Sequence, residues 1–228
     1  MPAAHRDPAL DALLHPFASG LLPWPQQVLF LRAREGAALH AQGRRGLQAT
    51  QPFRPEAARL ERLGVGLLDE DALPARQFPL VLVLPPRQRE EARALLARAC
   101  AAVAPGGHVV VAVANDEGAK SREAELKQLA GAVSTLSKHH CRVFWTTGDA
   151  PADPALQAQW AQADAPRTQP CAEVPGGRFR TRPGVFAWDR VDAASEMLAE
   201  ALPDDLRGRV ADFGAGWGYL SLQVLACC

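Results

Sequence analysis

The residues that best indicate a chemical function lie in a glycine-rich loop near the end of the printed sequence. The loop reads Asp212-Phe213-Gly214-Ala215-Gly216-Trp217-Gly218, after a stretch from Arg209 that predicts a strand and before a helix that starts near Trp217. Glycine is required where a backbone takes a positive φ or touches a ligand. The first turn of a helix offers unpaired N–H groups and a positive dipole end to a polar ligand. The combination of a strand, an acid, three alternate glycines and a helix predicts a site for a nucleotide-like cofactor.

Two cofactors compete for this loop. A dinucleotide fold requires G-x-G-x-x-G/A, whose last small residue lets the helix pack closely on the strand, and here the large ring of Tyr219 stands at that position. The Asp212 carboxylate would also repel a pyrophosphate, whereas S-adenosylmethionine (SAM) presents a methionine ammonium and no phosphate. The loop therefore favours SAM over NAD(P), and a tight turn without a ligand is the structural alternative.

A second group of polar residues follows one arm of a predicted β-hairpin. Arg178, Arg180 and Arg182 alternate along this arm, which places all three on one face of a strand. Arginine pairs well with phosphate, so we expect an RNA contact, although a solvated strand face explains the same pattern. The pair His139-His140 has no cysteine or carboxylate at metal-ligand spacing, so no metal site is expected.

The elements that must position these residues alternate between strand and helix. The strands are apolar on both faces, as expected where helices cover both sides of a parallel sheet, and the helices between them carry apolar stripes. The predicted strands are 27–31, 47–50, 80–84, 109–113 and 141–146, and the predicted helices are 55–63, 87–103 and 121–130. This alternation predicts a doubly wound α/β sheet.

The later part of the chain differs in composition. Ala, Asp, Pro and Gln dominate residues 148–170, which predicts a linker with a short helix around Leu156 to Ala161. Gly176-Gly177 then lies between two extended arms and predicts a β-hairpin over 171–186. Asp192 can cap the next helix, which Pro203 ends.

The composition is that of an ordinary soluble domain, with 48% hydrophobic and 22% charged residues. The formal net charge is zero, so no global field draws the chain to nucleic acid or acidic membranes, and any basic surface must be local. No apolar run approaches the ~20 residues that a membrane span needs. The five cysteines form no CxxC pair, which predicts free thiols in a reducing compartment. We therefore expect a cytoplasmic protein with no membrane association.

From Phe78 to Cys228 the sequence resembles the bacterial ribosomal RNA small subunit methyltransferase C family, whose members methylate guanine N2 in 16S rRNA. The segments that carry the resemblance occur in the family's order, and residues 1–77 match in general layout only. These segments are Pro105–Val111, Asn115–Ser121, Pro183–Phe186, Asp192–Ser195 and the glycine loop.

The resemblance implies two tandem Rossmann-like class I methyltransferase folds, of which only the second binds SAM and catalyses. At its loop position the first fold carries Phe30-Leu31-Arg32-Ala33-Arg34-Glu35-Gly36, with a single glycine. Leu84-Pro85-Pro86-Arg87 stands where such folds carry an Asn/Asp-Pro-Pro-aromatic catalytic loop, but it lacks both the amide and the ring. We therefore expect the first fold to be degenerate, with a strand-ending turn at Pro85-Pro86.

The second fold is expected to be only begun. A complete domain would add further strands, an acid for the ribose hydroxyls about 20 residues beyond the loop and the Asn-Pro-Pro-aromatic loop. Only ten residues follow Gly218, so we expect a truncated chain that holds part of a SAM site and no catalytic residues. The expected cofactor-binding residues are Asp212, Gly214, Ala215, Gly216, Gly218 and Phe186, where related enzymes place an aromatic ring and where core packing is the alternative.

Together these patterns predict an α/β protein in three parts. Residues 1–150 form a degenerate methyltransferase-like domain, 151–187 a linker and β-hairpin, and 188–228 the start of a SAM-dependent methyltransferase domain. The implied function is SAM-dependent methylation of guanine N2 in small-subunit ribosomal RNA, with that RNA or the small subunit as partner. The rival hypothesis is a non-catalytic RNA-binding or chaperone-like module, because the only complete domain is degenerate.

Overall fold

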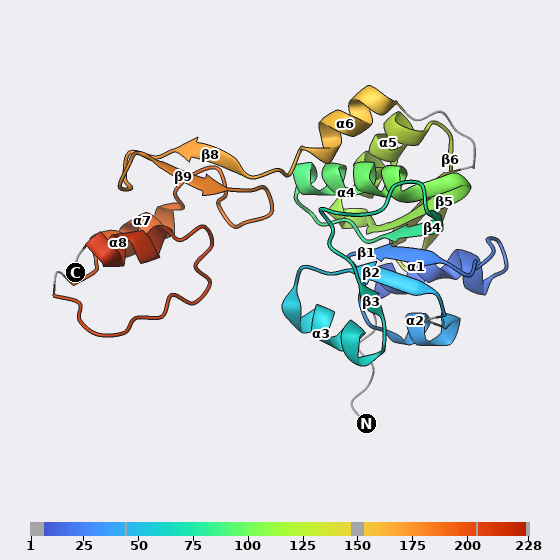
Figure 1. Cartoon of the computed structure of the whole chain (residues 1–228), viewed down its shortest axis with the longest axis horizontal. Helices are drawn as coiled ribbons and strands as arrows, with labels where there is room; N and C mark the ends of the chain where they lie inside the picture. The colour runs from blue at the N-terminus through green and yellow to red at the C-terminus, as the bar shows by residue number, and fades with distance from the viewer. Residues whose placement is uncertain (1–6, 44, 147–152, 204, 227–228) are drawn as a thin grey trace. The chain divides into compact units, whose positions relative to one another are not determined.

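The computed structural model describes residues 7–43, 45–146, 153–203 and 205–226. The chain divides into two compact units, Met1–Gln162 and Ala163–Cys228 (Figure 1). Each unit has its own hydrophobic core. Among the described residues no helix is both long enough and apolar enough to cross a membrane.

The first unit is built on a seven-stranded sheet in the order β3-β2-β1-β4-β5-β7-β6. Every strand is parallel to its neighbour except β7, which runs antiparallel to both β5 and β6. In the register of β1, Leu31 lies beside Thr50 of β2 and Val83 of β4. The strands are β1 (Val28–Leu31), β2 (Leu47–Thr50), β3 (Gly66–Leu67), β4 (Phe78–Val83), β5 (Val103–Ala114), β6 (Val133–Lys138) and β7 (Cys141–Thr146).

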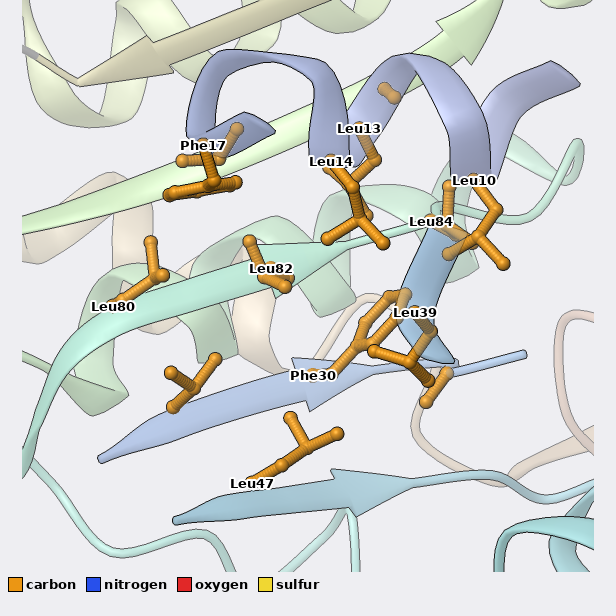
Figure 2. Packing of buried hydrophobic residues seen from close by; sticks show 14 of the residues in the cluster. Leu10, Leu13, Leu14, Phe17, Phe30, Leu39, Leu47, Leu80, Leu82 and Leu84 are labelled. Carbon is orange, nitrogen blue, oxygen red and sulfur yellow. The ribbon is translucent and has the colours of Figure 1, made fainter. Parts of the chain in front are cut away.

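Helices cover both faces of this sheet. Because successive side chains of a strand point to opposite faces, Phe30 packs in the cluster on one face while Leu29 and Leu31 pack on the other. Figure 2 shows the first cluster, in which Leu13 and Leu14 of the first helix lie over Phe30, Leu80 and Leu82. On that face lie α1 (Pro8–Ala18), α2 (Ala37–Gln42) and α3 (Arg54–Arg62), and on the other α4 (Arg89–Ala102), α5 (Ala119–Ala130) and α6 (Pro154–Ala161).

The predicted doubly wound α/β arrangement is confirmed for the first unit, and the sequence patterns missed four of its α-helices and β-strands. The start of α1 could have been predicted from Asp7, which caps the helix by accepting from the backbone N–H groups of Ala9 and Leu10 at 3.1 Å. β6 lies at the sheet edge with half-exposed side chains, so it has no continuous apolar run. The other two missed elements are α2 and β3, which are short.

His139 and His140, for which no metal role was expected, form the turn between β6 and β7. His139 and His140 both have positive φ values, 53° and 58°, as a two-residue hairpin turn of type I′ requires. Asn-Gly usually supplies that conformation, so the residue types here gave no sign of a turn.

The second unit contains a short hairpin and two helices. β8 (Arg167–Pro170) pairs antiparallel with β9 (Arg178–Thr181), and Gly176-Gly177 lies in the connection between them. The hairpin predicted over 171–186 therefore begins earlier, because its first strand lies in the segment that was assigned to the linker. The helices are α7 (Ala193–Glu200), capped by Asp192 as predicted, and α8 (Tyr219–Ala226). The buried core of the described part is small and consists of Cys171, Val174, Phe179 and Tyr219.

Two details of the predicted layout are corrected. The stretch 209–213, expected to be a strand, has no strand structure. A strand must pair its backbone N–H and C=O groups, and among the described residues of this unit no strand lies beside it. The short helix at 154–161 was assigned to a linker that begins at 151, but α6 packs on α4, and the division between the units falls after Gln162.

Candidate functional site

The glycine loop has the backbone conformation that its sequence predicts. Gly214, Gly216 and Gly218 have φ values of 78°, 58° and 94°, a left-handed region that other L-residues adopt only at a cost. The Gly218 N–H donates to the Ala215 carbonyl at 2.8 Å, and the Leu222 N–H donates to the Gly218 carbonyl at 3.0 Å. The loop therefore turns tightly and leads directly into α8.

Asp212, the acid that argued for SAM, is held in place by the helix after the loop. The Ser221 hydroxyl donates to its Oδ2 atom at 2.7 Å. The residue is only partly buried, so its carboxylate keeps an acceptor surface beside the loop. This negative charge, held in place beside the loop, suits a positively charged amine.

A small pocket of about 100 Å³ opens beside the loop. Phe186, with 68% of its surface exposed, lines it, and the Phe186 carbonyl lies 3.6 Å from where a Cβ atom on Gly216 would be. The structure thus brings together five of the six predicted cofactor residues, Asp212, Gly214, Ala215, Gly216 and Phe186, while Gly218 instead precedes the first residue of α8.

The same pocket includes two polar residues that the sequence analysis did not place in the site. Asp192 and Ser195 come from the start of α7, where the Asp192 carboxylate accepts from the Ser195 N–H at 3.0 Å and from its hydroxyl at 3.2 Å. Both belong to a segment quoted for the family resemblance. Nothing in the local sequence showed that α7 begins beside the glycine loop.

Aromatic rings attach the loop to the hairpin. Trp217 stacks on Phe179, with 3.6 Å between ring centroids, and its indole N–H donates to the Arg190 carbonyl at 3.2 Å. Tyr219 is buried at the start of α8, and burial, together with the nearby Glu196 carboxylate, raises the pKa of its phenol. The ring that argued against a dinucleotide is therefore a core residue of the second unit.

The three hairpin arginines do not have equivalent surroundings. Arg178 and Arg180 are exposed on β9, while Phe179 and Thr181, which alternate with them, are buried. Arg182 follows the strand, and its guanidinium contacts the Asp164 carboxylate at 3.0 Å. The Asp164 side chain is completely buried. The expectation of three arginines on one solvent face therefore holds for two of them, and Arg182 has a structural ion pair.

In the first unit, the loop after β1 has no comparable cradle. Its one glycine, Gly36, has an extended backbone with φ of 179°, and a Cβ atom there would lie 2.6 Å from Leu10 Cδ2 of α1. A side chain at this position would have to displace the end of the buried Leu10 side chain. In the loop after β4, Arg87 forms an ion pair with Glu117 at 2.6 Å, and Leu84 is buried.

Two protein families match separate parts of the chain. The family described as Methyltransferase small domain N-terminal matches residues 57–163, and the family described as Methyltransferase small domain matches residues 176–228. The two matches therefore fall almost entirely on different units of the structure.

Curated relatives and a solved structure point the same way. Ribosomal RNA small subunit methyltransferase C of Psychromonas ingrahamii is 29% identical over 150 residues, 65% of this chain and 42% of the relative. The protein of that name from Vibrio vulnificus is 31% identical over 147 residues, 63% of this chain and 41% of the relative.

The solved structure is a 16S rRNA N2 methyltransferase of T. thermophilus in complex with AdoMet and guanosine. It matches with a TM-score of 0.77 and 25% identity, over 99% of this chain and 62% of the other. The predicted α/β class I methyltransferase fold is thereby confirmed. The chain spans about two fifths of the length of the curated relatives.

Proposed function

Because the chain belongs to the ribosomal RNA small subunit methyltransferase C family, we propose that the protein containing these residues is a SAM-dependent rRNA methyltransferase. Its reaction transfers a methyl group from SAM to the exocyclic N2 amine of a guanine in small-subunit ribosomal RNA. The observation that carries this proposal is the pocket that joins the left-handed glycine loop, Asp212 and Phe186.

The residues of this pocket fit the cofactor. SAM supplies an electrophilic methyl group that an amine can attack directly. Gly214 and Gly216 would let the backbone approach the cofactor closely, and the Asp212 carboxylate, which Ser221 holds in place, would pair with the methionine ammonium. The exposed Phe186 ring offers an apolar surface beside them. In such a reaction, positioning of the two reactants supplies most of the rate.

We assign no catalytic residue within these 228 residues. The Pro85-Pro86 turn lacks the amide and the aromatic ring of the catalytic loop, and its neighbour Arg87 is paired with Glu117. The role that we propose for the first unit is support of folding and of RNA binding. Ribosomal RNA as substrate makes the cytoplasm the proposed location.

The RNA-contacting residues that we propose are Arg178 and Arg180. Both are exposed on one face of β9, so their guanidinium groups can reach phosphate oxygens. We withdraw Arg182 from this set, because its guanidinium is already bound to the buried Asp164 carboxylate.

A methyl-transfer assay tests the proposal. The intact protein that contains these residues is incubated with methyl-labelled SAM and small ribosomal subunits that lack the modification, and the digested rRNA is examined for N2-methylguanosine. We expect labelled product, and Gly216→Val should abolish it because a branched Cβ is strained at a φ of 58°. RNA binding without any labelled guanosine would instead support the non-catalytic, chaperone-like alternative.

A further inference from the structure

The loop after β1 in the first unit can be aligned with the glycine loop of the second unit, and one position of the alignment shares its backbone conformation. Aligning Phe30–Gly36 with Asp212–Gly218 places Arg32 at the position of Gly214. Both residues have a left-handed backbone, with φ values of 58° and 78°. A residue other than glycine pays roughly 1–3 kcal/mol for such a conformation. A left-handed turn is therefore present at this position in both units, with arginine in the first and glycine in the second.

The Arg32 side chain is held by two carboxylates. Its Nε atom donates to Glu70 Oε2 at 2.8 Å, and its Nη2 atom donates to Glu70 Oε1 at 2.9 Å and to Glu91 Oε1 at 2.7 Å. The side chains are mostly buried, with 18%, 13% and 15% of their surface exposed for Arg32, Glu70 and Glu91. The guanidinium thus bridges both acids, which a single point charge could not do in the same geometry.

The hydroxyl of Thr50 connects this group to the backbone of the turn. The Arg32 N–H donates to Thr50 Oγ1 at 3.2 Å, and Thr50 Oγ1 donates to Glu70 Oε2 at 3.0 Å. Thr50 is the last residue of β2 and is buried. The same carboxylate therefore binds the side chain of Arg32 and, through Thr50, the turn that carries it.

The position of this group in the sheet is the one at which open α/β sheets bind ligands. The strand order reverses between β1 and β4, and ligands bind outside the carboxyl ends of the strands at such a reversal. Arg32 directly follows β1, Glu70 follows β3, and Glu91 lies in the first turn of α4, which follows β4. The guanidinium therefore connects elements from both sides of the reversal.

We propose that Arg32 is an internal ligand of the first unit. Its guanidinium fills the position that a cofactor would take in an active domain of this fold, and it holds β1, the segment after β3 and α4 together in place of a bound molecule. The first unit is consequently closed to cofactors at this position and requires none for its stability.

The electrostatics agree with this role. Burial alone would lower the pKa of Arg32, but hydrogen bonds and charges from Glu70 and Glu91 outweigh it and raise the pKa. Arg98 lies farther from Glu70, with 3.9 Å between Nη1 and Oε1. Removal of the Arg32 side chain would therefore take the closer cation from two mostly buried carboxylates and leave Glu70 with the more distant Arg98.

Chemical rescue tests the proposal on the 228-residue chain. Arg32→Gly removes the guanidinium without adding backbone strain, and we expect it to lower the Tm of the first unit by roughly 5–15 °C. Guanidinium chloride at low millimolar concentration, far below denaturing levels, should restore most of that loss, whereas equal sodium or ammonium chloride should not. Arg34→Gly is the matched control, because Arg34 in the same loop has an exposed ion pair with Asp7, and it should show neither effect.

Two further variants keep the proposal testable even if Arg32→Gly does not fold. Arg32→Lys keeps the charge but not the several N–H donors of the planar guanidinium, and its Tm should lie between those of the unchanged chain and Arg32→Gly. Adding Glu91→Gln to Arg32→Gly should raise the Tm above that of Arg32→Gly alone, because it relieves the repulsion between the acids. An unchanged Tm in Arg32→Gly, a loss that guanidinium does not reduce, or a double variant less stable than Arg32→Gly would each overturn the proposal.

Discussion

The rings of Phe179 and Trp217 lie nearly parallel, with 3.6 Å between their centroids and 13° between their planes. Phe179 belongs to β9, where the exposed Arg178 and Arg180 flank it, and Trp217 belongs to the glycine loop. One strand therefore presents guanidinium groups to solvent on one face and holds the proposed cofactor loop on the other. The hairpin fixes the distance between the two proposed binding surfaces.

This contact leads to the first prediction. Phe179→Ala should destabilise the second unit by about 3 kcal/mol or more, because it removes a large side chain from a small core. Hydrogen exchange of the amides from Gly214 to Leu222 should then become faster. Phe53→Ala, which removes an exposed ring from the first unit, is the control and should leave these amides unchanged. Unaltered protection in Phe179→Ala would show that the stack does not support the loop.

The second prediction concerns affinity for the cofactor. The pocket that Gly214, Gly216 and Phe186 line has about 100 Å³, whereas pockets for small molecules usually have roughly 300–1,000 Å³. A neighbouring pocket of about 520 Å³ borders Asp212 and Phe213, but none of the three loop glycines lines it. We therefore expect the 228-residue chain to bind SAM weakly or not at all in a calorimetric titration. A low-micromolar dissociation constant would mean that these residues already form a sufficient site.

The third prediction concerns RNA. Replacing Arg178 and Arg180 together by Gln should weaken binding to single-stranded rRNA and reduce the slope of log K against log salt by about 1.4, because each lost phosphate contact contributes roughly 0.7. Arg54→Gln with Arg87→Gln removes the same charge from exposed positions of the first unit, where each guanidinium is already paired with a carboxylate of Glu61 or Glu117, and should leave the slope nearly unchanged. Equal slopes in the two double variants would indicate that Arg178 and Arg180 form a solvated strand face and do not contact RNA.

Arg182 should behave differently from its neighbours, which is the fourth prediction. Arg182→Gln removes a partner of the buried Asp164 carboxylate, and breaking a buried ion pair typically costs about 3–5 kcal/mol. We expect a loss of stability in the second unit, measured by denaturant unfolding, that exceeds the effect of Arg178→Gln. Similar stability in both variants would contradict the structural assignment of Arg182.

The fifth prediction is a pH dependence of stability in the first unit. Burial would raise the pKa of Glu123, but hydrogen bonds from Lys127, Arg142 and Thr135 outweigh it and lower the pKa from 4.5 to about 2. Because the pKa is lower in the folded state, the stabilisation is present above pH 4.5 and is lost as the pH falls toward 2. At most it amounts to roughly 3 kcal/mol.

Thermal unfolding between pH 7 and acid pH measures this effect. The wild-type chain should lose more stability over that range than Glu123→Gln, which has no carboxylate to protonate. Parallel stability curves for the two proteins would show that Glu123 does not contribute through its charge.

Several features of the fold could be predicted because they depend on local sequence. The apolar strands at 28–31 and 109–113 follow from burial on both faces, and the left-handed glycines at 214, 216 and 218 follow from the absence of a side chain. The start of α7 at Asp192 follows from capping. Each of these preferences acts within a few residues, so the residue types alone express it.

Other features were decided by contacts between distant segments. Residues 209–213 have the composition of a strand, but strand structure requires a neighbour, and none is present among the described residues of that unit. The helix at 154–161 resembled part of a linker until its contacts with α4 placed it in the first unit. Composition carries no information about which partner is available.

Arg182 and Arg32 show that local sequence also fails to indicate the partners of side chains. Arg182 continued a regular alternation in the sequence, yet it binds Asp164, 18 residues earlier. Arg32 marked only the loss of a glycine, yet it binds Glu70 and Glu91, 38 and 59 residues later. The sequence by itself indicated the family resemblance through its motifs, and it determined the α/β fold class and the glycine loop because these follow from local conformational preferences. Only the tertiary structure decided which charges are free to bind a ligand and which are bound within the protein, because the energy of an ion pair depends on distance and burial.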